Sequence, residues 1–146
     1  MKDFIINICA PWKAPQTSAK SIAPFDLFFL SCLAAHADGK VVEFGCGATT
    51  VELCRLGYDV ETFSVDISKA AKKAGLTAKF NRCDVMDPEW LDRIIESVRG
   101  ASLLAIDALH TYEFAEYYAK NIFPHVTCPI WIHDYWNSTG YIPYGE

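Results

Sequence analysis

Short apolar runs alternate with helix-like segments through most of the chain. Five runs have the length and composition of buried strands, namely 40–44, 59–65, 78–82, 102–106 and 129–133. The intervening segments have helical spacing and capping residues, at 49–55, 67–74, 87–98 and 112–122, with a further helix expected at 25–37. This alternation predicts an α/β fold, a Rossmann-like three-layer sandwich with a mainly parallel sheet of about five strands.

Composition narrows the class of protein. The chain has 146 residues, of which 51% are hydrophobic and 21% charged, so we expect one globular domain over 1–146. Residues 1–24 are expected to form an irregular lead-in and 138–146 a tail. No apolar run approaches the roughly 18 residues that cross a bilayer, and no signal peptide pattern is present, so the sequence predicts a cytoplasmic protein without a membrane partner.

Charge and cysteine usage exclude further classes. A net charge of −5 opposes nucleic acid as the main partner and favours a small molecule. The 6 cysteines are scattered, and no C-x-x-C pair occurs among them. We therefore expect reduced thiols and neither a disulfide framework nor a structural zinc site.

An acidic residue or a glycine turn follows every expected strand. These ends are Glu43 to Gly47, Asp66, Asp84, Asp107 with His110, and His133 with Asp134. In open parallel sheets, ligands bind outside the carboxyl ends of the strands, where the strand order reverses. The sequence therefore predicts a ligand site at this edge of the sheet.

The turn that starts at Glu43 indicates which ligand to expect. A dinucleotide-binding turn, G-x-G-x-x-G, would have its third glycine where Thr50 stands. Glu43 lies two positions before the first glycine, and its carboxylate would repel a pyrophosphate and attract a cation. NAD is therefore disfavoured, and a nucleoside that carries a positive charge is favoured.

These motifs resemble the class I S-adenosylmethionine (SAM)-dependent methyltransferases over about residues 40–137. The E-x-G-x-G turn is similar to the first motif of that family, with Thr49 where a third glycine is common. The segments I-D-A-L-H-T-Y-E at 106–113 and I-H-D-Y at 132–135 resemble a branch of small-molecule O-methyltransferases with I-D-x-x-H-x-Y and H-D-Y strand ends.

The resemblance implies SAM as the cofactor and a set of residues that bind it. These are Glu43, Gly45, Cys46, Gly47, Thr49, Asp66, Ile67, Asp84, Val85 and Asp107. In this interpretation Glu43 lies near the ammonium of SAM, Asp66 binds the ribose hydroxyls, and Asp84 or Val85 meets the adenine.

The resemblance also implies catalytic and metal-binding residues. Asp107, His110 and His133 are the implied catalytic residues, with either histidine as the base that takes the proton of the acceptor. Asp107 and Asp134 match carboxylates that hold a divalent ion such as Mg²⁺ in metal-dependent relatives. The expected function is methyl transfer to a small-molecule acceptor, with a hydroxyl preferred. The alternative is a SAM-binding module without methyl transfer.

Each of these residues also has a plainer interpretation. The glycine turn could be only a tight connection, and Asp66 and Asp84 could be helix N-caps. His110 could be a polar residue at the start of a helix, and His133 a core histidine.

The end of the chain departs from the family. The sheet of the family usually has seven strands, and the dozen or so residues after Asp134 are too few for two more. We therefore expect a truncated sheet with an open edge at its fifth strand, followed by the aromatic residues Tyr135, Trp136, Tyr141 and Tyr144. A second copy covering that edge, in a homodimer, is the expected solution.

Overall fold

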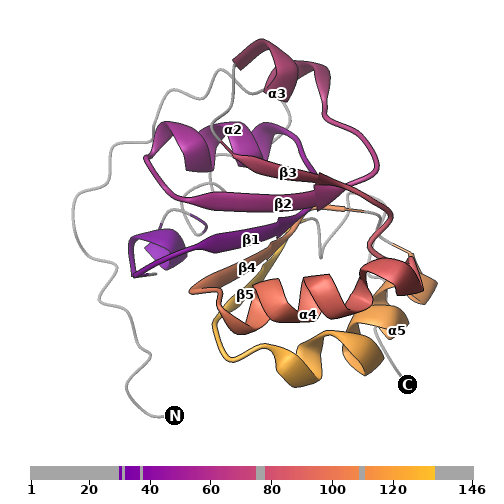
Figure 1. Cartoon of the computed structure of the whole chain (residues 1–146). Coiled ribbons are helices and arrows are strands. Elements are labelled where there is room, and N and C mark those ends of the chain that lie inside the picture. The colour runs from indigo at the N-terminus through magenta and orange to yellow at the C-terminus, as the bar shows by residue number, and fades with distance from the viewer. Residues whose placement is uncertain (1–29, 31, 37, 75–77, 109–110, 134–146) are drawn as a thin grey trace, which may run out of the picture.

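A five-stranded parallel sheet forms the centre of the protein. The computed structural model describes residues 30, 32–36, 38–74, 78–108 and 111–133. The strands are β1 (Val41–Phe44), β2 (Val60–Ser64), β3 (Lys79–Arg82), β4 (Leu103–Ile106) and β5 (Ile130–Ile132). They are all parallel and lie in the order β3-β2-β1-β4-β5 (Figure 1). The predicted α/β Rossmann-like fold is therefore confirmed.

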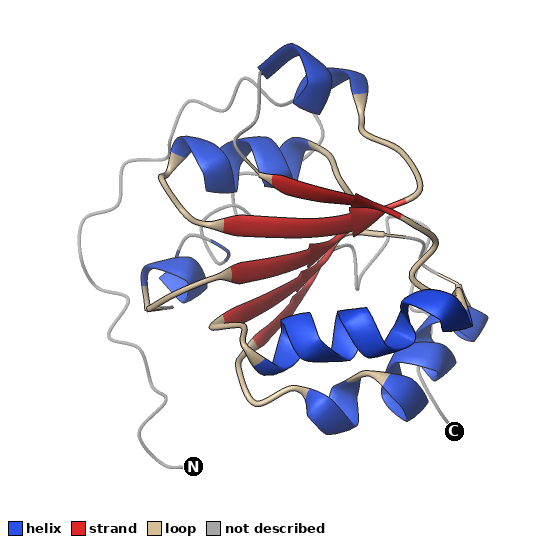
Figure 2. Cartoon of the chain, in the orientation of Figure 1, coloured by secondary structure: helices blue, strands red, loops and turns tan. Residues whose placement is uncertain are grey.

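Helices cover both faces of this sheet. They are α2 (Ala48–Arg55), α3 (Lys69–Ala74), α4 (Leu91–Arg99) and α5 (Tyr112–Asn121), with the 3-10 turns η1 (Pro88–Trp90) and η2 (Phe123–His125). The helices α2 and α3 lie on one side of the strands, and α4 and α5 lie on the other (Figure 2). Residues 30 and 32–35 are also helical.

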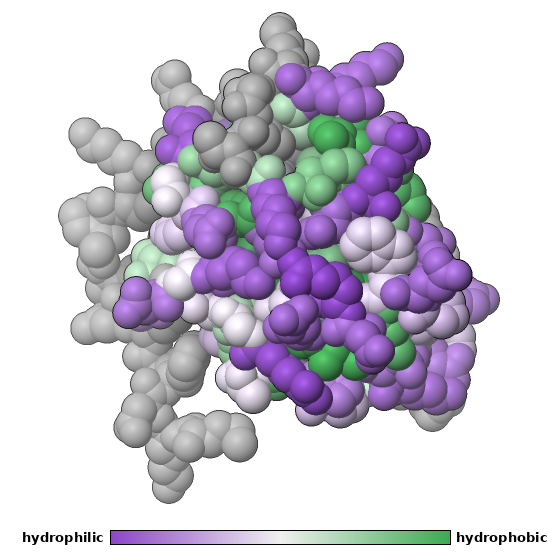
Figure 3. Space-filling view, viewed as in Figure 1, coloured by the Kyte–Doolittle hydropathy of each residue, from purple (hydrophilic) through white to green (hydrophobic). Residues whose placement is uncertain are grey.

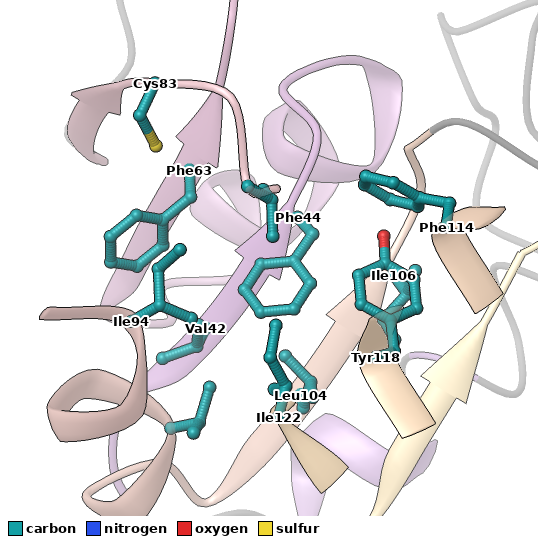
Figure 4. Packing of buried hydrophobic residues seen from close by; sticks show 12 residues of the cluster. Val42, Phe44, Phe63, Cys83, Ile94, Leu104, Ile106, Phe114, Tyr118 and Ile122 are labelled. Atoms are coloured by element: carbon teal, nitrogen blue, oxygen red, sulfur yellow. The ribbon is translucent and has the colours of Figure 1, made fainter. Parts of the chain in front are cut away.

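Two apolar layers hold the helices on the sheet. On the side of α4 and α5, Phe44 stacks on Tyr118 with ring centroids 5.6 Å apart and meets the edge of Phe63 at 6.3 Å (Figure 4). On the other side, Leu53 and Leu103 belong to a second buried cluster. The strands β1 and β4 are buried along their whole length, as expected for central parallel strands covered on both faces.

The expected elements agree with the observed ones to within two residues at most ends. The predicted helix at 87–98 divides into η1 and α4. Asp87 caps η1 as expected, since its side chain accepts a hydrogen bond from the backbone N–H of Glu89 at 3.0 Å. The lead-in 1–24 and the tail 138–146 lie outside the described residues.

A buried ionic cluster ties β1, β2, β3 and α4 together near the amino ends of the strands. Glu61 is 2% exposed and forms ion pairs with Lys40 at 2.7 Å, Lys79 at 2.9 Å and Arg93 at 2.9 Å. These cations hold the pKa of Glu61 down at about 2 even though burial opposes ionisation. Figure 3 shows that hydrophilic side chains cover much of one face of the molecule, with apolar patches between them.

The free thiols among the described cysteines agree with what the sequence predicts. Free thiols are found at Cys32, Cys46, Cys83 and Cys128, and Cys83 is buried as the sequence predicts for a small apolar side chain. In the described part of the chain, no helix has the length and apolar character needed to cross a bilayer.

Candidate functional site

The carboxyl ends of β1 and β4 meet where the strand order reverses. After β1 the chain continues to β2 and β3 on one side, and it then crosses back to β4 on the other side of β1. The first residues beyond these strands are Gly45 and Asp107, and the N–H of Asp107 donates to the carbonyl of Phe44 at 2.8 Å. This is the position at which open α/β sheets bind ligands.

The close approach of the two strand ends explains Gly45. Its φ of +105° favours glycine, and a Cβ at this position would lie 2.1 Å from the carbonyl oxygen of Asp107. By contrast, a Cβ on Gly47 would meet no atom of the described residues within 4 Å. The tight-connection interpretation therefore accounts for Gly45, whereas no steric contact among the described residues accounts for Gly47.

Gly45→Ala is therefore expected to destabilise the fold by about 2 kcal/mol, because the variant combines a strained backbone with a steric clash. Gly47→Ala is the matched comparison: its Cβ is not crowded by the described residues, so it is expected to lose less stability, within the roughly 1 kcal/mol that alanine costs at a helix N-cap. Urea unfolding of both variants measures this difference. Equal stabilities would contradict the steric role of Gly45.

Glu43 lies beneath the turn in a fully buried position. Its Oε2 accepts a hydrogen bond from the Thr50 hydroxyl at 2.6 Å, and Thr50 Oγ1 in turn accepts from the N–H of Gly47 at 2.9 Å. Among the described residues, Oε1 of Glu43 has no hydrogen-bond partner. Burial, with a smaller contribution from the Asp107 carboxylate, raises the pKa of Glu43 to about 8 despite the hydrogen bond from Thr50.

Asp107 is fixed by contacts from two other elements. The Thr49 hydroxyl in the first turn of α2 donates to Oδ2 at 2.7 Å, and Nδ1 of His133 lies 3.1 Å from Oδ1. His133 is buried just beyond β5, where its ring stacks on Trp131 at a centroid distance of 5.4 Å. A hydrogen bond to an ionised Asp107 carboxylate, which only accepts, would put the proton on Nδ1 of His133 and leave Nε2 as the basic nitrogen.

A pocket of about 200 Å³ opens over these strand ends. Its walls include Gly45, Cys46, Asp84, Val85 and Asp107, which are five of the residues predicted to bind SAM. The remaining walls were not predicted, and they are Phe63, Ser64, Val65, Cys83, Ala108 and Phe114. These six are mostly apolar residues of strand ends and α5, which the sequence pattern assigns to the core.

Asp66 and Ile67 do not line this pocket. Asp66 is exposed, and its Oδ1 accepts from the N–H of Ile67 at 2.8 Å and pairs with Lys72 at 3.3 Å. The backbone hydrogen bond, followed by the contribution of Lys72, lowers the pKa of Asp66. Ile67 lines a second pocket, of about 240 Å³, beside α3.

Neither Asp66 nor Asp84 caps a helix. In the first turn of α3 the Ser68 hydroxyl accepts from the N–H of Ala71 at 3.2 Å, which is the role considered for Asp66. Oδ1 of Asp84 accepts from the N–H of Met86 at 2.9 Å and so closes a turn before η1. The N-cap interpretation is therefore wrong for both residues.

The metal prediction depends partly on residues beyond the described ranges. Within these ranges no group of three or more His, Cys, Asp or Glu side chains could hold a metal ion. Asp134 and His110 lie outside them, and both oxygens of Asp107 already accept hydrogen bonds or contact His133. Mg²⁺ binding by Asp107 and Asp134 therefore stays a prediction, as does the catalytic role of His110.

Comparison with known proteins does not add to this picture. No protein-family model matches the chain, and no curated protein matches it with significant similarity.

Proposed function

We propose that the protein binds SAM at the carboxyl edge of its sheet and transfers the methyl group to a small-molecule acceptor, preferably a hydroxyl. The observation that carries this proposal is the pocket at the reversal point together with the buried Glu43 beside it. A carboxyl that is buried with an unpartnered oxygen is costly, and a cation placed at the turn would offset that cost.

The residues of the site fit a positively charged nucleoside. Gly47 leaves space at the turn for the amino-acid part of SAM, near Glu43. Phe63, Val85 and Phe114 give the pocket apolar walls suited to an adenine ring, and Asp84 adds a carboxylate that accepts hydrogen bonds. When bound, SAM supplies a methyl group on a positively charged sulfur, which an acceptor oxygen displaces in line.

Asp107 and His133 are suited to prepare the acceptor. The Asp107 carboxylate keeps Nε2 of His133 basic and stabilises the ring when it is protonated. Thr49 limits the movement of Asp107, so this pair is held before any ligand enters. In the proposed reaction His133 takes the proton from the acceptor hydroxyl.

One observation favours the alternative, a SAM-binding module without methyl transfer. Asp107 lines the pocket, whereas His133 is buried and is not among the lining residues. An acceptor would therefore have to displace protein atoms to reach the ring. The two functions share a binding site and differ only in whether a product forms.

Two variants test the proposal: Gly47→Val tests the place of SAM, and His133→Gln tests the role of His133 in methyl transfer. Because a branched side chain would occupy the open space at the turn, we expect Gly47→Val to weaken SAM binding at least tenfold. His133→Gln is expected to bind SAM normally and to lose methyl transfer by about a hundredfold, the scale of a general base.

Calorimetry and a methyl-transfer assay against a panel of hydroxylated small molecules measure the two effects. Wild-type affinity in Gly47→Val would contradict the placement of SAM. Tight SAM binding by the wild-type protein without transfer to any acceptor would support the binding module instead.

A further inference from the structure

We propose that ligand binding at this site releases a proton from Glu43, so that the empty site holds a neutral carboxylic acid and the filled site a carboxylate. This goes one step beyond the proposed function and rests on it, since SAM or its demethylated product brings the cation. The affinity for a cationic ligand should therefore depend on pH, and the ionisation of Glu43 should cause this dependence.

The contacts of Glu43 favour the neutral form when no cation is present. The side chain is 0% exposed, and the one hydrogen bond described for it comes from a neutral hydroxyl, that of Thr50. An ionised carboxylate in such a place lacks water and, among the described residues, a counter-charge, which strongly disfavours the ionised form. The raised pKa, about 8, agrees with this geometry.

Glu61 shows what cations do to a buried carboxyl in the same sheet. It lies on β2, next to β1, and is 2% exposed. Three cations surround Glu61, and its pKa falls to about 2. Cations and the hydrogen bonds from Asn81 and Ser97 stabilise the ionised form of Glu61, so an ammonium near Glu43 should shift the pKa of Glu43 in the same direction.

No described group next to Glu43 supplies a permanent positive charge, so the cation that shifts its pKa has to come from the ligand. Thr50 of α2 and Thr62 of β2 do not titrate near neutral pH. Among the described residues, the titratable neighbours are the Cys46 thiol, the Asp107 carboxylate and, through Asp107, His133. The Asp107 carboxylate opposes the ionisation of Glu43, and its hydrogen bond with His133 makes that histidine the other candidate source of a proton.

The turn provides a direct connection between the ligand and the buried carboxyl. The N–H of Gly47 donates to Thr50, and the Thr50 hydroxyl donates to Glu43. A cation that settles at the turn therefore acts on Glu43 across one hydroxyl group in a water-poor region, where charges interact strongly.

The experiment is calorimetric titration with S-adenosylhomocysteine, which carries the ammonium and is not consumed. Titrations at pH 7 in phosphate and in Tris give the number of protons released, because the two buffers have different heats of ionisation. We expect about one proton, and an affinity that rises about tenfold between pH 6 and pH 7. Methylthioadenosine lacks the ammonium and should bind without releasing a proton.

Two variants identify the source of the proton. Glu43→Gln should bind S-adenosylhomocysteine without proton release, whereas His133→Asn should release the proton as the wild-type protein does. Binding by the wild-type protein with no proton release, or release that persists in Glu43→Gln, would overturn the proposal while leaving the proposed function intact. A complete absence of binding would overturn both, and the wild-type pH series decides the matter even if a variant fails to fold.

Discussion

In the unliganded protein, Glu43→Gln is expected to gain stability over wild type as the pH rises. From pH 5 to pH 8 the free energy of unfolding of the variant, minus that of wild type, should increase by about 3 kcal/mol. The reason is the pKa of Glu43, which rises from an ordinary value of 4.5 to about 8 on folding. Between these values the unfolded chain is ionised and the folded protein keeps its proton. The stability of the wild-type protein therefore falls as the pH rises from 4.5 to 8, and glutamine removes this loss.

Urea unfolding of both proteins at several pH values from 5 to 8 measures this effect. Asp66→Asn is the control, because Asp66 is exposed and its pKa is lowered, so its contribution changes only in acid. Two stability curves that run parallel from pH 5 to pH 8 would show that Glu43 is ionised in the folded protein. A stabilising substitution at this position is consistent with a residue retained for binding at a cost in stability.

Glu61→Gln is expected to destabilise the protein by between about 3 and 5 kcal/mol, because it leaves three cations around a buried position without their counter-charge. Lys40 directly precedes β1, Lys79 lies in β3 and Arg93 lies in α4, so the loss affects the packing of all three elements. The contribution of Glu61 to stability depends on pH in the opposite direction to that of Glu43. The stabilisation is present above pH 4.5, the ordinary pKa of the group, and is lost as the pH falls toward about 2.

Glu96→Gln provides the comparison for this variant. Glu96 pairs with Arg93 at 2.9 Å on the surface, where its side chain is 74% exposed. Its loss should not change the urea midpoint measurably, since exposed ion pairs contribute little. If Glu61→Gln unfolded at the same urea concentration as Glu96→Gln, the ionic cluster would have no structural role.

The sequence predicts the fold well because the apolar periodicity and the capping and turn residues indicate the same element boundaries. The apolar runs that form β1 and β4 are buried on both faces, and Asp87 with Pro88 marks the start of η1. The predicted helix 87–98 is less accurate, because the change from a 3-10 turn to an α-helix at Leu91 leaves no mark in the apolar spacing.

The site could be predicted only in part. Strand ends are recognisable in a sequence, so Gly45, Asp84 and Asp107 are predictable as site residues, and all three line the pocket. The hydrogen bond from Thr49 to Asp107 joins residues 58 positions apart and depends on how α2 sits over β4. No periodic pattern contains that information.

The role of Thr50 was missed for a related reason. In the sequence it counts as the absence of a glycine, whereas in the structure it links the turn to Glu43. The resemblance places Asp66 in the site, but its side chain is exposed and accepts from the N–H of Ile67 in its own turn. A ligand that met its carboxylate would have to displace the contact with Lys72.

The most direct test of the central claim is a nuclear magnetic resonance titration of the backbone amides with S-adenosylhomocysteine. We expect saturable shifts at the carboxyl edge, at Gly47, Val85 and Ala108, and none at the opposite edge, at Lys40 and Lys79. Shifts confined to the amino edge, or no shifts at millimolar concentrations of S-adenosylhomocysteine, would contradict a SAM site at the reversal point of the sheet.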